Sequence, residues 1–354
     1  MDVNPRSTAD GLLAVKTIVA AASLACVIHA SVAYAQSVTA EATAHAGHST
    51  STEEVSVAGA QLRAFGDAVS GVRFFAEAAL AKSSDEDGDS DAFGAAYPYA
   101  GRVQVIEAYA ERMFRPRNGL LSIRAGRYRT PFGISSGSEQ GYVGFLRAPL
   151  IRYDGYYALS NNFLEHGADV VVGVPKLTLE ASVGAPDEVG TAVRRSDVDS
   201  VVRLQGFHGP FIVGVSRIWT MPYQDPRFSS GRAVFTGIDL RWMYEGIALR
   251  GEWLTGKPFD GTTTTGWYVD VIVHRVRMGP VTAVARVERT DYDVPARPSR
   301  DLHATRQTLG ARIRIIEGLS AQVNVLHQSG LPNYGDTALD VGVTYSIRRD
   351  LRRH

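Results

Sequence analysis

Most of this chain is built from segments of about ten residues in which apolar and polar side chains alternate, joined by connections that are alternately short and long. The segment 234–256, VFTGIDLRWMYEGIALRGEWLTG, shows one such unit, in which Ile238 and Leu240 alternate with Asp239 and Arg241. A strand places successive side chains on opposite faces, so this period of two gives one apolar and one charged face. Short and long connections that alternate between two ends are typical of a transmembrane β-barrel.

The fold class predicted from this pattern is all-β, a transmembrane antiparallel up-and-down β-barrel of about fourteen strands. Residues 55–66 could add another strand or an extension, so sixteen strands are possible. An even count places both ends of the barrel on the side of the short turns. The expected strands are 71–82, 102–114, 119–128, 167–174, 176–184, 198–208, 210–220, 234–244, 246–256, 266–278, 280–291, 304–315, 318–328 and 337–347.

The first 35 residues are expected to be a signal peptide. Basic residues precede a short apolar run, and Ala33 and Ala35 supply the small side chains that a signal peptidase recognises. A membrane anchor is the weaker interpretation because the run is short for a spanning helix. A lipoprotein would use Cys26, but Ser23 stands where such sites usually have leucine. Cleavage after Ala35 would leave a chain without cysteine.

Three further regions complete the expected organisation. Residues 36–54 are small and polar and are expected to be a disordered leader, in which His45 and His48 are solvated rather than bound to a metal. The barrel is expected over residues 55–347, followed by a basic tail over residues 348–354.

Charge composition argues against one class of partner. The 37 basic and 37 acidic side chains balance, so a nucleic-acid-binding function is not expected. The basic residues are nearly all arginine, which stays ionised and can bind carboxylate or phosphate through two hydrogen bonds. The same bias can come from genomic base composition.

Alternation also assigns a set of charged side chains to the lumen, because an arginine facing lipid at the bilayer midplane would cost about 2–4 kcal/mol. The basic members are Arg73, Arg124, Arg203, Arg217, Arg241, Arg250, Arg286, Arg312 and Arg314. The acidic members are Glu77, Asp169, Glu180, Asp239, Glu252, Asp270, Glu288 and Asp340. Such a lumen would be hydrated, as in a channel, but the opposite charges could equally neutralise one another and brace the wall.

The longest connection, residues 129–166, is expected to be functional, because long loops without secondary structure are usually functional or disordered and this one is rich in aromatic residues. If it folds into the barrel, Arg147, Arg152, Asp154 and Glu165 are the expected charges of a pore constriction. The alternative is a loop that caps the outside of the barrel.

Two short segments resemble known outer-membrane proteins. The last expected strand places Gly342, Tyr345 and Ile347 where barrel-assembly signals have a glycine and two apolar or aromatic residues, which implies recognition by the barrel-assembly machinery. The segment LSIRAGRYRTPFGIS resembles a strand-to-loop passage of Gram-negative porins, especially the phosphate-selective and related substrate-specific group. Its matching residues are Gly126, Arg127, Tyr128, Pro131, Phe132 and Gly133.

The resemblance implies a diffusion channel with an inward-folded loop, surrounded by outer-membrane lipid and possible as a homotrimer, as is common among porins. We therefore expect passive passage of small hydrophilic solutes or ions, with no catalytic residue, metal or cofactor. A structural or adhesive barrel without an open channel is the first alternative. A barrel-embedded hydrolase is the second, but His274, His208 and Ser216 form no recognisable catalytic spacing.

Overall fold

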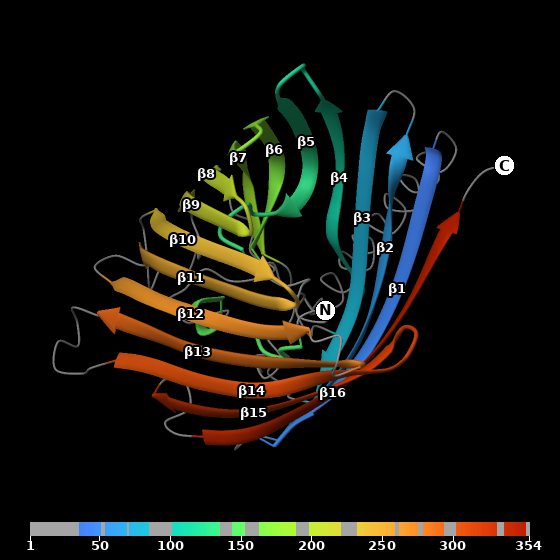
Figure 1. Ribbon diagram of the computed structural model, residues 1–354. Helices are drawn as coiled ribbons and strands as arrows, with labels where there is room; N and C mark the ends of the chain where they lie inside the picture. Colours follow the sequence, from blue (N-terminus) through green and yellow to red (C-terminus); the bar gives the residue numbers. More distant parts are fainter. Residues whose placement is uncertain are drawn as a thin grey trace, which may run out of the picture.

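The computed structural model describes residues 35–50, 54–68, 71–84, 101–134, 144–152, 163–188, 198–220, 232–258, 262–274, 279–293, 302–330 and 336–351. These residues form sixteen strands that close into one antiparallel barrel, each pairing with its neighbours in sequence (Figure 1). The strands are β1 (Ala35–Ser49), β2 (Val55–Ala68), β3 (Val72–Ser83), β4 (Gln104–Phe114), β5 (Leu120–Arg129), β6 (Phe163–Val174), β7 (Leu177–Glu188), β8 (Asp199–His208), β9 (Phe211–Thr220), β10 (Ala233–Tyr244), β11 (Ile247–Lys257), β12 (Thr263–His274), β13 (Val281–Asp293), β14 (Leu302–Ile316), β15 (Leu319–Gly330) and β16 (Asp336–Leu351).

The predicted alternation of faces is present in the structure. On β10, the side chains of Ile238 and Leu240 are 46% and 45% exposed on the outward face, whereas Asp239 between them is 1% exposed on the inner face. Asp239 pairs in register with Glu252 of β11, so two acidic side chains meet on the inner face of the barrel. Apolar side chains therefore cover the outside of the wall and charged side chains its inside.

The barrel has the sixteen strands that the sequence left possible, two more than the expected count of about fourteen. Residues 55–66, which sequence left open, belong to β2, and residues 36–49 of the expected disordered leader belong to β1. Strand β1 pairs with β2 on one side and with β16 on the other, where Val38 lies opposite Leu351 and Ser49 opposite Asp340. Figure 1 shows β1 in blue beside β16 in red, which closes the barrel.

The correction at residues 36–49 has a physical reason. The outward positions of β1 are filled by Ala42, Ala44 and Ala46, whose short side chains give little hydrophobic contrast in the sequence. Without β1, the facing edges of β2 and β16 would keep unpaired backbone groups, and pairing satisfies them. The expected basic tail is corrected for the same reason, because β16 continues to Leu351 and pairs with β1 over those residues.

The turns at one end of the barrel are short. Between β10 and β11, Glu245 and Gly246 have φ angles of 45° and 80°. Two successive positive φ values define the tight type I′ hairpin turn, whose twist matches that of the flanking strands. Strand β1 begins and β16 ends at this same end, because Val38 pairs with Leu351.

The described residues contain one short 3-10 helix, η4 (Leu150–Arg152). Within these described ranges, no helix has the length and apolar character needed to cross a membrane. The expected signal peptide lies outside the described residues, apart from its last position, Ala35, where β1 begins.

Candidate functional site: the inner wall and the segment 144–152

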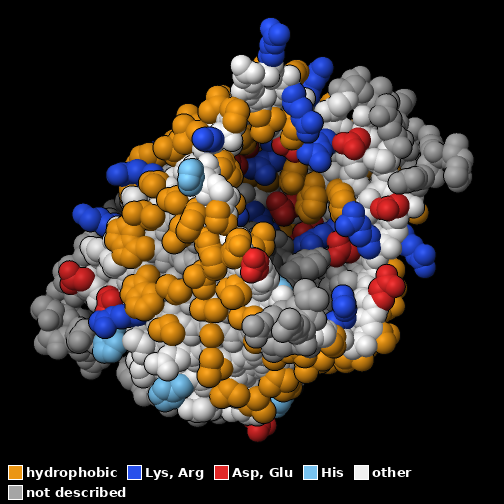
Figure 2. Space-filling model, in the orientation of Figure 1, with side chains coloured by type: hydrophobic (Ala, Val, Ile, Leu, Met, Phe, Trp, Pro, Cys, Tyr) orange, Lys and Arg blue, Asp and Glu red, His pale blue; other side chains and the backbone are white. Residues whose placement is uncertain are grey.

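Nine of the charged side chains that were expected to line the lumen lie on the inner face of the barrel wall. Figure 2 shows a hollow in this face of the molecule, with basic and acidic side chains around it. Register and burial place on the inner face Arg124, Arg203, Arg241, Arg250, Arg286, Arg312, Arg314, Glu252 and Glu288.

Ion pairs on this wall join different strands rather than residues of one strand. Asp270 of β12 accepts hydrogen bonds from Arg250 of β11 at 2.7 Å and from Arg286 of β13 at 2.6 Å. On another part of the wall, Arg203 of β8 reaches Asp239 of β10 at 3.1 Å. The charges are thus satisfied by partners on adjacent strands or on the next strand but one, and the same contacts stiffen the wall.

The same arrangement continues around the barrel to β5–β7. Arg124 lies 3.2 Å from both Asp169 of β6 and Glu180 of β7. Its guanidinium group also covers the ring of Tyr128 at 4.5 Å. This arginine therefore links β5 to β6 and β7 through charge, and its cation–π contact holds it against its own strand.

Two placements differ from the sequence prediction. Arg217 faces outward, because it lies on the same side of β9 as the exposed Val213 and Val215, and its guanidinium group covers the ring of Trp219 at 5.2 Å. Arg306 of β14 was missed, although it is fully buried on the inner face. Arg306 lies six residues before Arg312 on the same strand, and residues an even number apart share a face, so alternation alone could have identified it.

An aromatic stack on β2–β4 was also not anticipated. The ring centroids of Phe65 and Phe75 lie 6.3 Å apart, and those of Phe75 and Tyr109 5.3 Å apart, with interplanar angles of 21° and 17°. The guanidinium carbon of Arg348 lies 5.4 Å from the ring centroid of Phe65, and that of Arg124 lies 5.3 Å from the ring centroid of Tyr109. These ring contacts brace this part of the wall.

The segment 144–152, part of the long connection between β5 and β6, lies against the inner face of β10–β16. Arg147 donates two hydrogen bonds to Asp340 of β16, from Nε at 2.6 Å and Nη2 at 2.9 Å, and a third to Ser49 of β1. The backbone oxygen of Arg147 accepts a hydrogen bond from Arg286 of β13 at 2.9 Å. One residue of the connection thus contacts three strands.

Arg152 joins the other end of this segment to the wall. Its guanidinium group forms an ion pair with Glu252 of β11 and donates to the backbone oxygen of Phe132 at 3.0 Å. The adjacent Gly133 has a φ of 66°, and a Cβ at that position would overlap the Glu252 carboxylate and the Arg152 guanidinium. The contact between Arg152 and Glu252 therefore requires glycine at position 133.

Backbone groups of the segment are also bound by wall side chains. The amide of Leu150 donates to Glu288 at 2.5 Å, and the amide of Leu146 donates to Asn324 at 2.8 Å. Arg306, paired with Glu288 at 2.7 Å, donates to the backbone oxygen of Ala148. Backbone N–H and C=O groups of the segment that lose contact with water when it packs on the wall therefore keep hydrogen-bond partners.

Apolar packing supports the same docking. A buried cluster joins Phe132 and Ile151 from the connection to Phe235, Leu254 and Tyr268 from the inner face of β10–β12. Burial of such side chains is favourable by about 1.5–3 kcal/mol each. The segment is therefore attached to the wall by ion pairs, backbone hydrogen bonds and hydrophobic contact.

The four expected constriction charges do not form one group. Arg147 and Arg152 lie in the segment, and Asp154 lies outside the described residues. Glu165 is not in a loop, because β6 begins at Phe163. It is buried and accepts a hydrogen bond from Ser182 of β7, so it belongs to the wall.

The residues of the porin-like motif separate into two groups. Gly126 and Arg127 belong to β5, where Arg127 faces outward and donates to the backbone oxygen of Ile106 at 3.0 Å. Pro131, Phe132 and Gly133 follow the end of β5, and all three are buried.

The barrel-assembly pattern occupies β16. Gly342 faces inward, where a Cβ would meet the side chain of Leu146. Tyr345 and Ile347 are exposed on the outward face.

In the part of the chain that the structure describes, no three metal-ligating side chains come together.

Comparison with known proteins gives likeness of fold without likeness of sequence. No family model and no curated protein match the chain. Solved structures do match. One is OmpF of Salmonella typhi in complex with daunomycin, with 13% identity, a TM-score of 0.62, and coverage of 88% of this chain and 97% of that one.

Two further structures cover the same share of this chain. OmpT, an outer membrane protein of Vibrio cholerae in its trimer form, has 10% identity and a TM-score of 0.55 over 88% of this chain and 99% of that one. A substituted porin of Rh. blastica has 15% identity and a TM-score of 0.51 over 88% and 100%. At such identities the likeness establishes the fold alone, which is the closed antiparallel sixteen-stranded barrel of outer-membrane porins.

Proposed function

We propose that this protein is a non-enzymatic porin of a Gram-negative outer membrane, through which small hydrophilic solutes or ions diffuse passively. The observation that carries the proposal is the closed barrel with an apolar outward face and a charged inner face. Backbone groups can be satisfied within hydrocarbon only in a helix or a closed barrel, and charged inner residues require water or mutual pairing.

We infer further that the segment 144–152 lies in the lumen and narrows it. Its contacts with Asp340, Glu288 and Glu252 support this position, because all three acidic side chains face inward. Since Arg147 and Arg152 are each paired with an acid, their main role in this proposal is to anchor the segment. Any preference between anions and cations should therefore be weak.

Single-channel recording in a planar lipid bilayer tests the channel function. The purified protein should give discrete, ohmic conductance steps, and a salt gradient should give a reversal potential close to zero. The alternative, a structural or adhesive barrel without an open pore, predicts insertion without conductance. A solute-flux assay in liposomes separates the two in the absence of an applied voltage.

We also propose a homotrimer that buries the outward face of β1 and β2. That face carries exposed alanines where other strands carry large aliphatic residues, as in the paired positions Ala44 and Ala60 compared with Leu240 of β10. Small side chains allow two sheets to approach closely, whereas bulky ones suit lipid. Ala60→Trp should lower the trimer fraction in detergent, measured by analytical ultracentrifugation, and Ile238→Trp on β10 should not.

Recognition by the barrel-assembly machinery is proposed for β16. The outward, exposed positions of Tyr345 and Ile347 would let another protein contact them before the barrel closes. Tyr345→Ser should slow the appearance of folded protein in the membrane fraction, whereas Leu339→Ser on the same face should have a smaller effect.

A further inference from the structure

Three buried glycines of the inner wall lie under side chains of the connection between β5 and β6. They are Gly237 of β10, Gly266 of β12 and Gly342 of β16. None of these three has a positive φ angle, so other residues could adopt the same backbone conformation. Glycine inside a strand weakens the strand and often marks a place where another group approaches closely. The reason for these glycines therefore lies in what packs against them.

At Gly237 and Gly342 the connection itself occupies the space that a side chain would need. A Cβ built on Gly237 would lie 2.9 Å from Cζ of Phe132, and one built on Gly342 would lie 2.8 Å from Cδ2 of Leu146. Carbon atoms pack at about 3.5–4.0 Å, so both positions would clash. At each of these two glycines, atoms of every other residue that could meet the Cβ lie at 3.5 Å or more.

Gly237 and Gly266 flank one large side chain in a single row across the wall. Gly237 pairs in register with Leu254, and Leu254 pairs with Gly266. A Cβ built on Gly266 would lie 2.5 Å from Cγ2 of Ile151. Phe132, Ile151 and Leu254 belong to one buried cluster. The row thus runs gap, side chain, gap, and two side chains of the connection fill the gaps on either side of Leu254.

Gly342 leaves a gap at the other end of the segment 144–152. It pairs in register with Gly47 of β1, so neighbouring positions on the first and last strands both lack a side chain. Leu146 lies over Gly342 and packs against a buried cluster that includes Val55 of β2. The Leu146 amide donates to Asn324 of β15. The connection therefore fits the wall both at β10–β12 and where β1 closes the barrel with β16.

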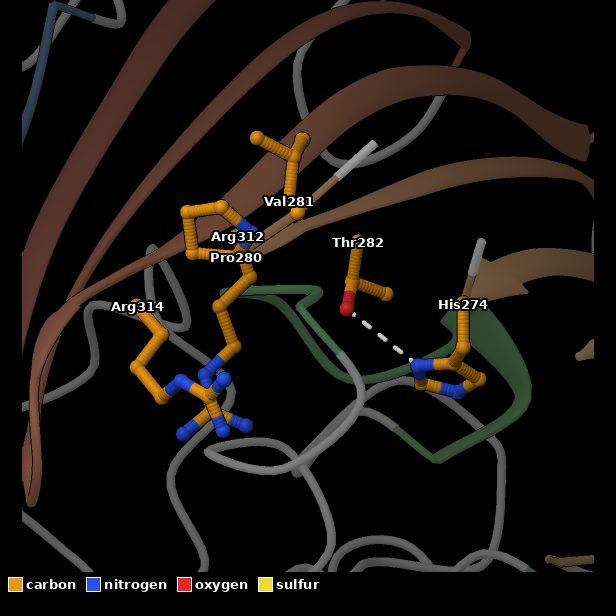
Figure 3. Close-up of a pocket in the computed structure, with 7 residues that line it drawn as sticks. His274, Pro280, Val281, Thr282, Arg312 and Arg314 are labelled. Carbon is orange, nitrogen blue, oxygen red and sulfur yellow. Dashed lines mark hydrogen bonds between the residues drawn. The ribbon is translucent and has the colours of Figure 1, made fainter. Parts of the chain in front are cut away.

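The wall leaves open space beside the segment on the side of the short turns. A pocket of about 690 Å³ lies there on the inner face of β12–β14. Figure 3 shows its lining side chains, which include His274, Thr282, Arg312 and Arg314. Phe145 of the segment packs on Ile272 and Val284, which are the inner positions next to this pocket. Because wall side chains do not fill this space, the position of the segment has to be set by the contacts beneath it.

We propose that Gly237, Gly266 and Gly342 are positioning residues for the connection. They leave three gaps in the inner wall that receive Phe132, Ile151 and Leu146, and so fix the course of the connection across the lumen. Long charged side chains can reach their partners from several positions, whereas close-packed side chains fit in one. The inference deepens the proposed channel, because the course of the connection sets the width that is left for solutes. It rests on the proposed function only for that consequence.

Thiol labelling of the full-length mature protein in detergent micelles tests the proposal without any requirement for conductance. Ala148→Cys places a thiol in the middle of the segment, at a position that is 1% exposed. Its rate of reaction with a maleimide, followed by mass spectrometry of the peptide that contains residue 148, reports how often the segment leaves the wall. In this background, Gly237→Ala and Gly342→Ala should each speed labelling at least about tenfold, because overpacking destabilises the docked position.

Truncation of the overlying side chain should reverse each effect. Gly237→Ala with Phe132→Leu, and Gly342→Ala with Leu146→Ala, should each bring the labelling rate back to within about threefold of the background, because the effects of residues in contact are not additive. A glycine that served only the strand would gain nothing from these truncations. A glycine variant that folds only together with its truncation would support the proposal in the same way.

The matched control is Gly173→Ala, a buried glycine on the inner face of β6. A Cβ at this position would meet Thr178 of the wall at 3.2 Å, and no atom of the connection is among its nearest neighbours. Labelling of this control should stay within about twofold of the background, since the substitution lies apart from the docked segment.

The proposal is overturned if neither glycine variant speeds labelling in a barrel that is folded by circular dichroism, if Gly173→Ala speeds it equally, or if the truncations fail to restore it. Faster labelling of the glycine variants in a barrel that gives no conductance would overturn the proposed channel and leave the positioning role standing. A conducting barrel whose glycine variants label at the background rate would do the reverse.

Discussion

Arg147 and Asp340, 193 residues apart in the chain, are joined by two hydrogen bonds of 2.6 and 2.9 Å. Arg147 belongs to the long connection after β5, and Asp340 belongs to the last strand. Their side chains are 9% and 0% exposed, so the pair is shielded from solvent. This pair fixes the middle of the segment 144–152 to the inner wall near the point where β1 and β16 close the barrel.

Asp340→Ala should release this part of the segment. Removal of one partner of a buried ion pair leaves the other charge uncompensated, at a cost of about 3–5 kcal/mol. Movement of the segment away from the wall avoids that cost. Single-channel recordings should therefore show altered conductance and frequent current fluctuations. Asp291→Ala removes the acid of an exposed ion pair and should leave the current unchanged. Identical traces from the Asp340 variant and the unaltered protein would contradict the anchoring role.

Arg306→Met tests how much the buried ion pairs contribute to stability. The side chains of Arg306 and Glu288 are both fully buried, so the variant leaves a buried carboxylate without its partner and should lower the free energy of unfolding by about 3–5 kcal/mol. Arg289→Met, in an outward ion pair that is about half exposed, should cost about 0–1 kcal/mol. Urea unfolding followed by tryptophan fluorescence compares the two variants. Equal losses would argue against the pairing.

Gly133→Ala should disturb the contact between Arg152 and Glu252. The new Cβ would overlap both side chains, and a φ of 66° is unfavourable for alanine. We expect a barrel that folds but has a lower thermal midpoint and unstable single-channel current. Gly209→Ala is a control for the conformational cost alone, because Gly209 also has a positive φ but open space around its Cβ position. If both variants behave alike, backbone strain and not the lost contact explains the effect.

The alternation of side chains predicted a closed barrel and many of the charged side chains on its inner face. It assigned Arg250, Arg286 and Glu252 to the inner face, where the strand register also places them. Successive side chains of a strand point to opposite faces, so the face of one residue determines the face of every other residue in that strand. Alternation did not identify β1, because alanine and threonine differ too little in hydrophobicity to mark two faces. Arg217 was misassigned because charge was taken as a sign of the inner face, although near a strand end an arginine can lie outward over Trp219.

The partners of the inner charges could not be predicted in the same way. Arg250 and Glu252 lie two positions apart on one strand, yet Arg250 pairs with Asp270 and Glu252 pairs with Arg152. Neighbours across strands depend on register, which is set only when the barrel closes. The path of the connection between β5 and β6 likewise depends on wall residues that are distant in sequence, such as Asp340. Its length and aromatic content alone could therefore not decide whether it folds into the barrel or caps the outside.

Cleavage of the signal peptide after Ala35 remains a prediction. The mature chain would then start at Gln36, next to the beginning of β1. Strand β1 could therefore pair with β16 with no signal peptide attached to its end. N-terminal sequencing of protein from the membrane fraction should read Gln-Ser-Val. An intact Met1, or lipid attached to Cys26, would contradict this cleavage. Ala33→Asp with Ala35→Asp should cause the uncleaved precursor to accumulate.

The last prediction separates two roles of Arg147 and Arg152, which are to supply positive potential and to anchor the segment. Arg147→Lys with Arg152→Lys keeps both charges but loses the planar fork that binds a carboxylate through two hydrogen bonds. If anchoring is the main role, this variant should show greater current fluctuation and an unchanged reversal potential in a salt gradient.

Replacement of both arginines by glutamate changes the charge and also places carboxylates beside Asp340 and Glu252. Repulsion should detach the segment, raise the conductance and shift the reversal potential toward cations, because the inner wall would then carry an excess of acids. The lysine variant distinguishes the two effects. A large change in its reversal potential would show that the arginines control ion selectivity through their exact geometry. Quiet, unchanged current in both variants would show that the segment does not limit flow.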